Sequence, residues 1–101
     1  MMRQFLKSKI MNAKITRVDL EYEGSLGIPR DILEKVDILP GEKILVANKE
    51  NGARFETYAI ESESGFFLNG AAAHLGKIGD RLIIMSFGIS EETIVPKKVL
   101  L

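Results

Sequence analysis

Apolar and polar residues alternate along much of this chain, which is the pattern of strands that bury one face. Residues 11–15 carry apolar side chains at odd positions, and residues 18–22 carry them at even positions. One extra residue in a strand swaps the face that the strand buries. The change of parity near Thr16–Arg17 therefore predicts a β-bulge or a strand break there.

A short amphipathic helix is expected at residues 29–36. The spacing brings three apolar side chains onto one helical face, those of Ile32, Leu33 and Val36. Pro29 suits the first helical position, because the N–H that proline lacks has no partner inside a helix there.

The rest of the chain predicts short strands between turn residues, at 43–48, 53–60, 66–68, 81–87 and 96–101. Asn51–Gly52 favours a type I′ hairpin turn, which needs positive φ at both central residues. The apolar run near residues 81–87 predicts a strand buried on both faces. Six or seven short strands with one or two small helices predict a small, mainly β barrel in a single domain, residues 1–101.

Composition narrows the possible functions. Hydrophobic residues make up 46% of the chain, a rich share for so small a domain, which favours further burial between subunits. Basic and acidic residues number 14 each, and this balance argues against binding to nucleic acid or to a membrane surface. With no cysteine and one histidine, His74, neither disulfides nor a metal site are expected.

Targeting signals are not evident in the sequence. The N-terminal residues lack the apolar run of a signal peptide. The longest apolar run, residues 82–85, is far too short to span a bilayer. The expected location is the cytoplasm.

Candidate chemistry centres on Gly24–Ser25. Ser25 follows the strand expected at 18–22 and lies between two turns that contain glycine, so its backbone is expected to be exposed and flexible. In that setting the serine hydroxyl could attack the carbonyl of the preceding peptide bond. An ordinary turn has the same composition, so the rest of the chain has to decide between the two interpretations.

The strand expected at 53–60 carries a second set of candidates. In an ideal strand Arg54 and Tyr58 share one face and Thr57 points to the other. Arg54 offers a planar fork that matches a carboxylate, and Tyr58 offers a phenol that can give or take a proton. Cross-strand packing explains the same spacing, and Lys9 by itself is an ordinary solvated charge.

Residues 69–74 form a third candidate, compatible with one helical turn. Their small side chains leave backbone N–H groups accessible, and such groups can cradle a carboxylate or an oxyanion. Close packing of a tight turn is the alternative.

Four segments in order resemble the aspartate 1-decarboxylase family, pyruvoyl-dependent enzymes that make β-alanine for pantothenate synthesis. They are Lys7-Ser8-Lys9-Ile10, Asp19-Leu20-Glu21-Tyr22-Glu23-Gly24-Ser25, Asn51-Gly52-Ala53-Arg54-Phe55-Glu56-Thr57-Tyr58, and Asn69-Gly70-Ala71-Ala72-Ala73-His74 followed by Gly79-Asp80. Each segment is a weak motif alone, but the four together, near their usual spacing, are specific.

The resemblance implies a double-psi β-barrel, a homotetramer with active sites between subunits, and a carboxy-lyase that converts L-aspartate to β-alanine and CO2. It also implies a proenzyme that cuts itself between Gly24 and Ser25, which leaves residues 1–24 and 25–101. Ser25 then becomes an N-terminal pyruvoyl group, a covalent cofactor that forms a Schiff base with the substrate amine and needs no metal.

The resemblance further implies roles for four residues outside the cleavage site. Lys9 and Arg54 would hold a substrate carboxylate or a neighbouring charge. Thr57 would serve self-processing and substrate binding, and Tyr58 would be the catalytic proton donor.

The same carry-over implies that Tyr22 and Asn69 line the substrate pocket. Gly70, Ala71 and Ala72 would contribute backbone contacts to the substrate. Together with the roles above, these residues form the predicted substrate-binding set.

The sequence departs from the family at Met11, where members often carry a histidine, so a role tied to that histidine is not carried over. Members also often continue for some residues beyond the position of Leu101. The alternative function is a non-catalytic small barrel that binds a ligand or regulates, because barrels of this kind host unrelated functions.

Overall fold

The computed structural model describes all residues from 1 to 101. In chain order, its elements are β1 (Arg3–Asp19), β2 (Ser25–Pro29), α1 (Arg30–Val36), β3 (Lys43–Asn48), β4 (Arg54–Ser62), β5 (Phe66–Asn69), the 3₁₀-helix η1 (Gly70–Leu75), β6 (Arg81–Ser90) and β7 (Lys97–Leu100). Neither helix has the length and apolar character needed to cross a membrane.

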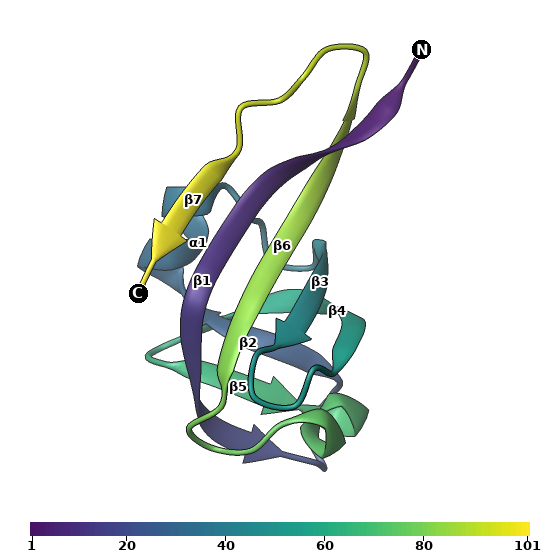
Figure 1. The fold of residues 1–101 in the computed structure, drawn as a ribbon. Helices are drawn as coiled ribbons and strands as arrows, with labels where there is room; N and C mark the ends of the chain where they lie inside the picture. Colours follow the sequence, from purple (N-terminus) through teal and green to yellow (C-terminus); the bar gives the residue numbers. More distant parts are fainter.

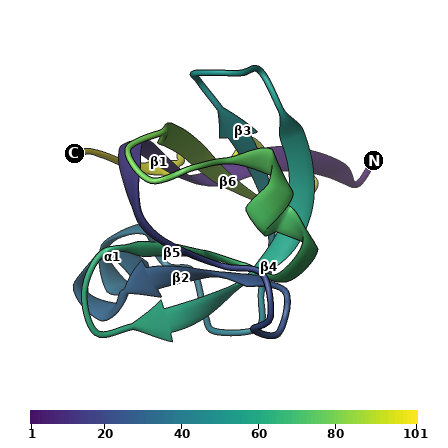
Figure 2. The ribbon, with the colours of Figure 1, turned by 90° about the horizontal axis from the view of Figure 1, so that it is seen from below.

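Six strands close into a barrel (Figures 1 and 2). The hydrogen-bonded order around the barrel is β1-β5-β2-β4-β3-β6, and β6 pairs with β1 to close the ring. β7 lies parallel to β1 as an additional edge strand. The predicted mainly β barrel of six or seven strands with one or two short helices is confirmed.

Alternation along the strands builds the core, because every second side chain points into the barrel. All six barrel strands contribute buried apolar side chains: Ile10, Ala13, Ile15, Leu26, Ile28, Ile44, Val46, Ala59, Phe66, Leu68, Leu82 and Ile84. α1 adds Ile32, Leu33 and Val36 to the same cluster, as the helical spacing predicted. Pro29, however, occupies the N-cap position, directly before the first helical residue, Arg30.

β1 contains the predicted bulge. Its pairing with β5 shifts register between Ile15 and Arg17, and Ile15 is buried whereas Arg17 is exposed. The predicted continuation of the strand to Tyr22 is wrong, because β1 ends at Asp19. Leu20 is 48% exposed and Tyr22 is 52% exposed, since residues 20–24 have to turn the chain toward β2.

The predicted hairpin between β3 and β4 is confirmed, but its turn is wider than a type I′ pair. Gly52 has a φ of +76°, whereas Asn51 is not among the residues with positive φ. The side-chain oxygen of Asn51 accepts a hydrogen bond from the N–H of Ala53 at 2.8 Å. This Asx turn organises the loop without a left-handed backbone at Asn51.

β6 buries one face only. Leu82 and Ile84 are fully buried in the core, whereas Phe87 is 43% exposed. Ile83 and Met85 are half-buried on the outer face with it. The prediction that this strand is buried on both faces is wrong for the single chain, because an apolar run does not reveal which molecule covers each face.

Candidate active site

One row of side chains crosses the outer face of the barrel where β1, β5 and β2 are neighbours. Asp19 of β1 pairs with Asn69 of β5, and Asn69 pairs with Ser25 of β2. Paired residues on adjacent strands point to the same side of a sheet. Ser25 therefore lies at the end of a row that starts at Asp19.

Ser25 is fully buried, although the sequence predicted an exposed backbone here. Its Oγ donates a hydrogen bond to the carbonyl oxygen of Glu23 at 3.0 Å. The same oxygen accepts a hydrogen bond from Nδ2 of Asn69 at 3.1 Å. Because Asn69 is itself only 3% exposed, the hydroxyl is oriented between a carbonyl and an amide away from solvent.

Gly24 lies directly against Gly70, the first residue of η1. Gly70 has a φ of +67°, and a Cβ built on it would stand 2.5 Å from the Cα of Gly24. That is far inside normal contact distance, so residue 70 has to be glycine. A Cβ on Gly24 meets nothing within 4 Å, so packing does not explain the glycine that precedes Ser25.

β4 runs beside Ser25 in parallel with β2. The observed pairing begins at Leu26 with Ala59, and one residue earlier this register sets Tyr58 beside Ser25. Tyr58 alternates with the buried Ala59, so its side chain points to the outer face, where it is half-buried. Thr57 has the opposite parity, as the sequence predicted, and pairs with the buried Ile44 of β3.

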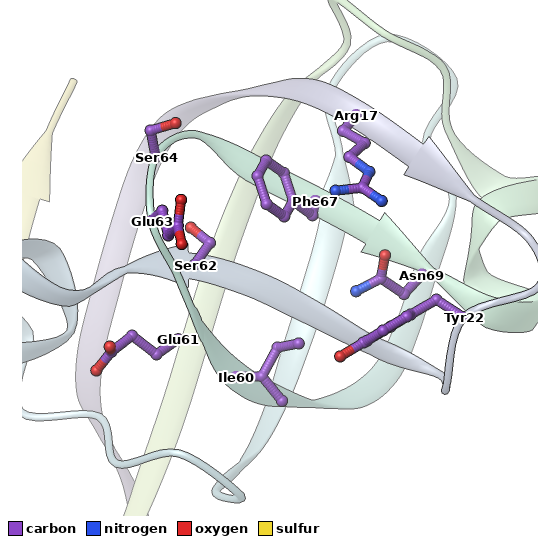
Figure 3. A pocket seen from close by; sticks show the side chains of 9 residues that line it. All are labelled: Arg17, Tyr22, Ile60, Glu61, Ser62, Glu63, Ser64, Phe67 and Asn69. Carbon is purple, nitrogen blue, oxygen red and sulfur yellow. The ribbon is translucent and has the colours of Figure 1, made fainter.

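Tyr22 and Asn69 line a pocket with a volume of about 370 Å³ beside this row (Figure 3). In the view of Figure 3 they lie with Arg17 toward one end, and Glu61 and Glu63 lie toward the other. The structure thus brings two of the predicted substrate-binding residues to one cavity. Arg17 is also there, although the sequence did not single it out.

Lys9 and Arg54 lie elsewhere on the outer surface. Lys9 pairs with Met85 on β6, so three strand spacings, about 14 Å, separate it from β4. Arg54 is four residues before Tyr58 on β4, which corresponds to about 13 Å along the strand. A single chain does not bring these two cations to Ser25.

η1 contains Gly70, Ala71 and Ala72, which were predicted to offer backbone contacts to the substrate, and a buried hydrogen-bond network fixes the far end of this helix. Ala71 is exposed and Ala72 packs against the core. Nδ2 of Asn48 donates to the carbonyl of Leu75 at 3.1 Å and to Oδ2 of Asp80 at 2.9 Å. Asn48 is 1% exposed and Asp80 is 5% exposed, so this network is part of the interior.

The perturbed titratable groups lie outside this cavity. Nε of Arg81 is 2.6 Å from Oε2 of Glu50. Hydrogen bonds from Arg81 lower the pKa of the Glu50 carboxyl, and the pKa of Arg81 is raised in turn. No group of three or more His, Cys, Asp or Glu side chains is placed to hold a metal ion.

Sequence reasoning missed Arg17 and Phe67, which pair across β1 and β5 next to the Asp19 row. The change of parity near Thr16–Arg17 was the available signal, because a bulge re-aims the side chains that follow it. Phe67 gave no signal, since its run of apolar neighbours does not reveal which side chain points outward.

Comparisons with known proteins agree on one family. The profile described as Aspartate decarboxylase matches residues 1–100. A protein named Aspartate 1-decarboxylase from Chlorobium phaeobacteroides is 51% identical over 90 residues, which are 86% of this chain and 69% of that protein. Proteins of the same name from Thermoanaerobacter pseudethanolicus and Staphylococcus aureus (strain JH9) are 48% and 49% identical, over 91% and 93% of this chain and 81% and 77% of their own lengths.

Proposed function

This chain belongs to the aspartate decarboxylase family, and from that premise we propose that it decarboxylates L-aspartate to β-alanine and CO2. It is a carboxy-lyase that supplies β-alanine for pantothenate, with the cytoplasm as the proposed location. We also propose that it is made as a proenzyme and that Ser25 provides the reactive group.

The observation that carries this proposal is the environment of Ser25. A serine hydroxyl is buried at the start of a strand, between the Glu23 carbonyl and the Asn69 amide. The preceding Gly24 presents no side chain to shield its own carbonyl carbon. Gly70 packs directly against Gly24, which limits the movement of the residue before Ser25.

We propose that self-cleavage proceeds in three steps. Ser25 Oγ attacks the Gly24 carbonyl carbon, the peptide C–N bond breaks, and the hydroxyl proton moves to the Ser25 nitrogen, which leaves an ester. Loss of the Ser25 α-proton then expels the Gly24 carboxylate. Water then hydrolyses the resulting dehydroalanine, whose nitrogen leaves as ammonia, and a ketone remains.

The residues around Ser25 fit such a pyruvoyl group. The Asn69 amide already donates to the Ser25 side-chain oxygen and would hold the group, together with the backbone of Gly70 and Ala71. When present, the ketone supplies an electrophile for the substrate amine and an electron sink for decarboxylation. Tyr58, beside Ser25 in the β4 register, would give its phenolic proton to the substrate α-carbon.

We propose that the working enzyme is a homotetramer. Lys9 and Arg54 are too far from Ser25 of their own chain to act there, so a second copy would have to bring them. The half-exposed outer face of β6, with Met85 and Phe87, is the kind of apolar surface that pairs with another subunit. Light scattering should report about four chains per particle, and a monomer that turns over aspartate would disprove this part.

Intact-mass measurement tests the central proposal. Wild-type protein should give residues 1–24 and a fragment from residue 25 that is lighter than a chain starting with serine by the mass of one ammonia, because the hydroxyl oxygen leaves with Gly24 and water supplies the ketone oxygen. Ser25→Ala should stay whole, because no hydroxyl remains to attack Gly24. The processed protein should release CO2 from L-aspartate, whereas an uncut wild-type chain without activity would leave only the non-catalytic barrel.

A further inference from the structure

The C-terminal end of η1 is fastened to the turn between β3 and β4. The carbonyl oxygen of Leu75, the last residue of η1, accepts a hydrogen bond from Nδ2 of Asn48 at 3.1 Å and another from Nδ2 of Asn51 at 3.0 Å. A carbonyl oxygen has two lone pairs, so these two amides satisfy it completely. Figures 1 and 2 show η1, in green, between this turn and the chain that leads into β2.

Both carboxamides are fixed in orientation by a second hydrogen bond. Oδ1 of Asn48 accepts a hydrogen bond from the N–H of Glu50 at 2.9 Å, and Oδ1 of Asn51 accepts one from the N–H of Ala53 at 2.8 Å. A carboxamide that is held at its oxygen aims its N–H donors in a defined direction, here toward Leu75. Asn51 is exposed whereas Asn48 is buried, so Asn51 can be changed without opening the interior.

The N-terminal end of η1 meets the Gly24–Ser25 bond. Nδ2 of Asn69, the residue before η1, donates to Oγ of Ser25 at 3.1 Å, and Gly70 packs against Gly24. A 3₁₀-helix of six residues spans about 12 Å, since it rises about 2 Å per residue. So short a helix is not stable by itself, and the contacts at its two ends therefore decide where it lies.

The amide of Asn51 has no part in the turn that contains it. The turn uses Oδ1 of Asn51, which accepts the Ala53 N–H, and the N–H of Gly52, which donates to the carbonyl of Asn48 at 2.8 Å. An aspartate at position 51 could build the same Asx turn. The bond from Nδ2 to Leu75 is therefore what asparagine adds at this position.

We propose that Asn51 is a positioning residue for self-cleavage, which anchors η1 so that Asn69 and Gly70 stay against the Gly24–Ser25 bond. This inference rests on the proposed function. The side chain of Asn51 bonds to Leu75 and Ala53 and not to the cleavage site, so it acts through η1. Without this anchor, Asn69 would hold the Ser25 hydroxyl in line for attack less of the time, and cleavage would be slower.

Asn51→Asp removes the anchor and keeps the turn. One carboxylate oxygen still accepts the Ala53 N–H, whereas the atom that faces Leu75 changes from a donor to an acceptor. Intact mass, followed over time from newly made chains, should show self-cleavage about three- to tenfold slower than in wild type, as expected for one hydrogen bond. Asn51→Ser also keeps an acceptor for the turn, is too short to bridge to Leu75 and adds no charge, so it should be slowed to a similar extent.

Asn12→Asp is the matched control. Nδ2 of Asn12 also donates to a backbone carbonyl, that of Leu101, at 2.8 Å, so this variant loses the same kind of bond and gains the same charge. Leu101 follows β7 and has no link to η1, and the control should therefore be cut at the wild-type rate. In the Ser25→Ala chain, which should stay whole, amide hydrogen exchange at residues 70–75 should become faster with Asn51→Asp and stay unchanged with Asn12→Asp.

The result that overturns this assignment differs from the one that refutes the proposed function. Wild-type cleavage rates in both Asn51 variants, or unchanged exchange at residues 70–75, would show that Asn51 does not position the cleavage site. Equal slowing in Asn12→Asp would assign the effect to charge or to general weakening of the fold, and would overturn the assignment as well. A wild-type chain that is never cut would instead refute self-processing itself.

Discussion

The contact between Gly70 and Gly24 makes a quantitative prediction about Gly70→Ala. The added methyl group would sit 2.5 Å from the Cα of Gly24 at a backbone φ of +67°. The left-handed conformation costs about 1 to 2 kcal/mol for alanine, and overpacking against backbone costs about 1 to 3 kcal/mol more. We expect Gly70→Ala to lose about 2 to 5 kcal/mol of unfolding free energy, the sum of these two costs.

Gly52→Ala separates the two contributions. Gly52 has a similar φ of +76°, but a Cβ there meets nothing within 4 Å, so its loss should be about 1 to 2 kcal/mol, the conformational cost alone. Gly24→Ala has neither problem and should change stability by less than about 1 kcal/mol.

Urea unfolding of these variants provides the assay, with Ser25→Ala as the common background so that every molecule has the same covalent chain. The midpoint and slope give the free energy of each variant. If Gly70→Ala is no less stable than Gly52→Ala, the close approach of Gly70 to Gly24 is not a real constraint. In the background that keeps Ser25, Gly70→Ala should also slow self-cleavage, because the added methyl group would push against Gly24 and shift its peptide bond relative to the hydroxyl.

Three other predictions concern the catalytic proton, the interior and pH. Tyr58→Phe should still be cut at Gly24–Ser25, but CO2 release should fall by about 10² to 10⁴; near-normal turnover would assign the proton to another donor. Asp80→Ala should cost about 1 to 3 kcal/mol in urea unfolding, since it leaves the buried Asn48 amide with one acceptor fewer, and an unchanged midpoint would show that the network is dispensable. Because the pKa of Glu50 is lowered by Arg81, wild type should be more stable than Glu50→Gln well above pH 4.5, and the difference should vanish as acid protonates Glu50 in the folded state; a difference that persists in acid would contradict the ion pair as its cause.

The barrel was predicted well because the signals for strands and turns lie in short stretches of sequence. Alternation and turn residues decide where strands begin and which face is apolar, and the parity change at Thr16–Arg17 located the bulge. The turn at residues 20–24 was missed because Leu20 and Tyr22 continue a strand-like spacing. Whether these two residues pair with a neighbouring strand depends on where β2 begins, and the arrangement of the whole barrel decides that position.

The candidate site was predicted in part. Ser25 was proposed from its turn context and then from a resemblance, whereas Asn69 and Tyr22 were proposed as pocket residues from the resemblance alone. The structure brings the three residues to one corner because β2 pairs with β5. Residues far apart in sequence meet only through such strand pairings, and the spacing of residues along the chain does not reveal which strands pair. For the same reason, the local change of parity indicated the bulge but not that Arg17 would lie over Phe67.

The pairing of β1 has a consequence for the lifetime of the processed protein. A cut after Gly24 would leave β1 as a separate peptide, held by its ladders with β5, β6 and β7. Once that peptide dissociates on unfolding, reassembly is a bimolecular search instead of an intramolecular one, and the serine that made the cut is gone. The lifetime of the processed protein would then be set by the rate of unfolding and not by the equilibrium between folded and unfolded states. A molecule that unfolds once would not recover its activity.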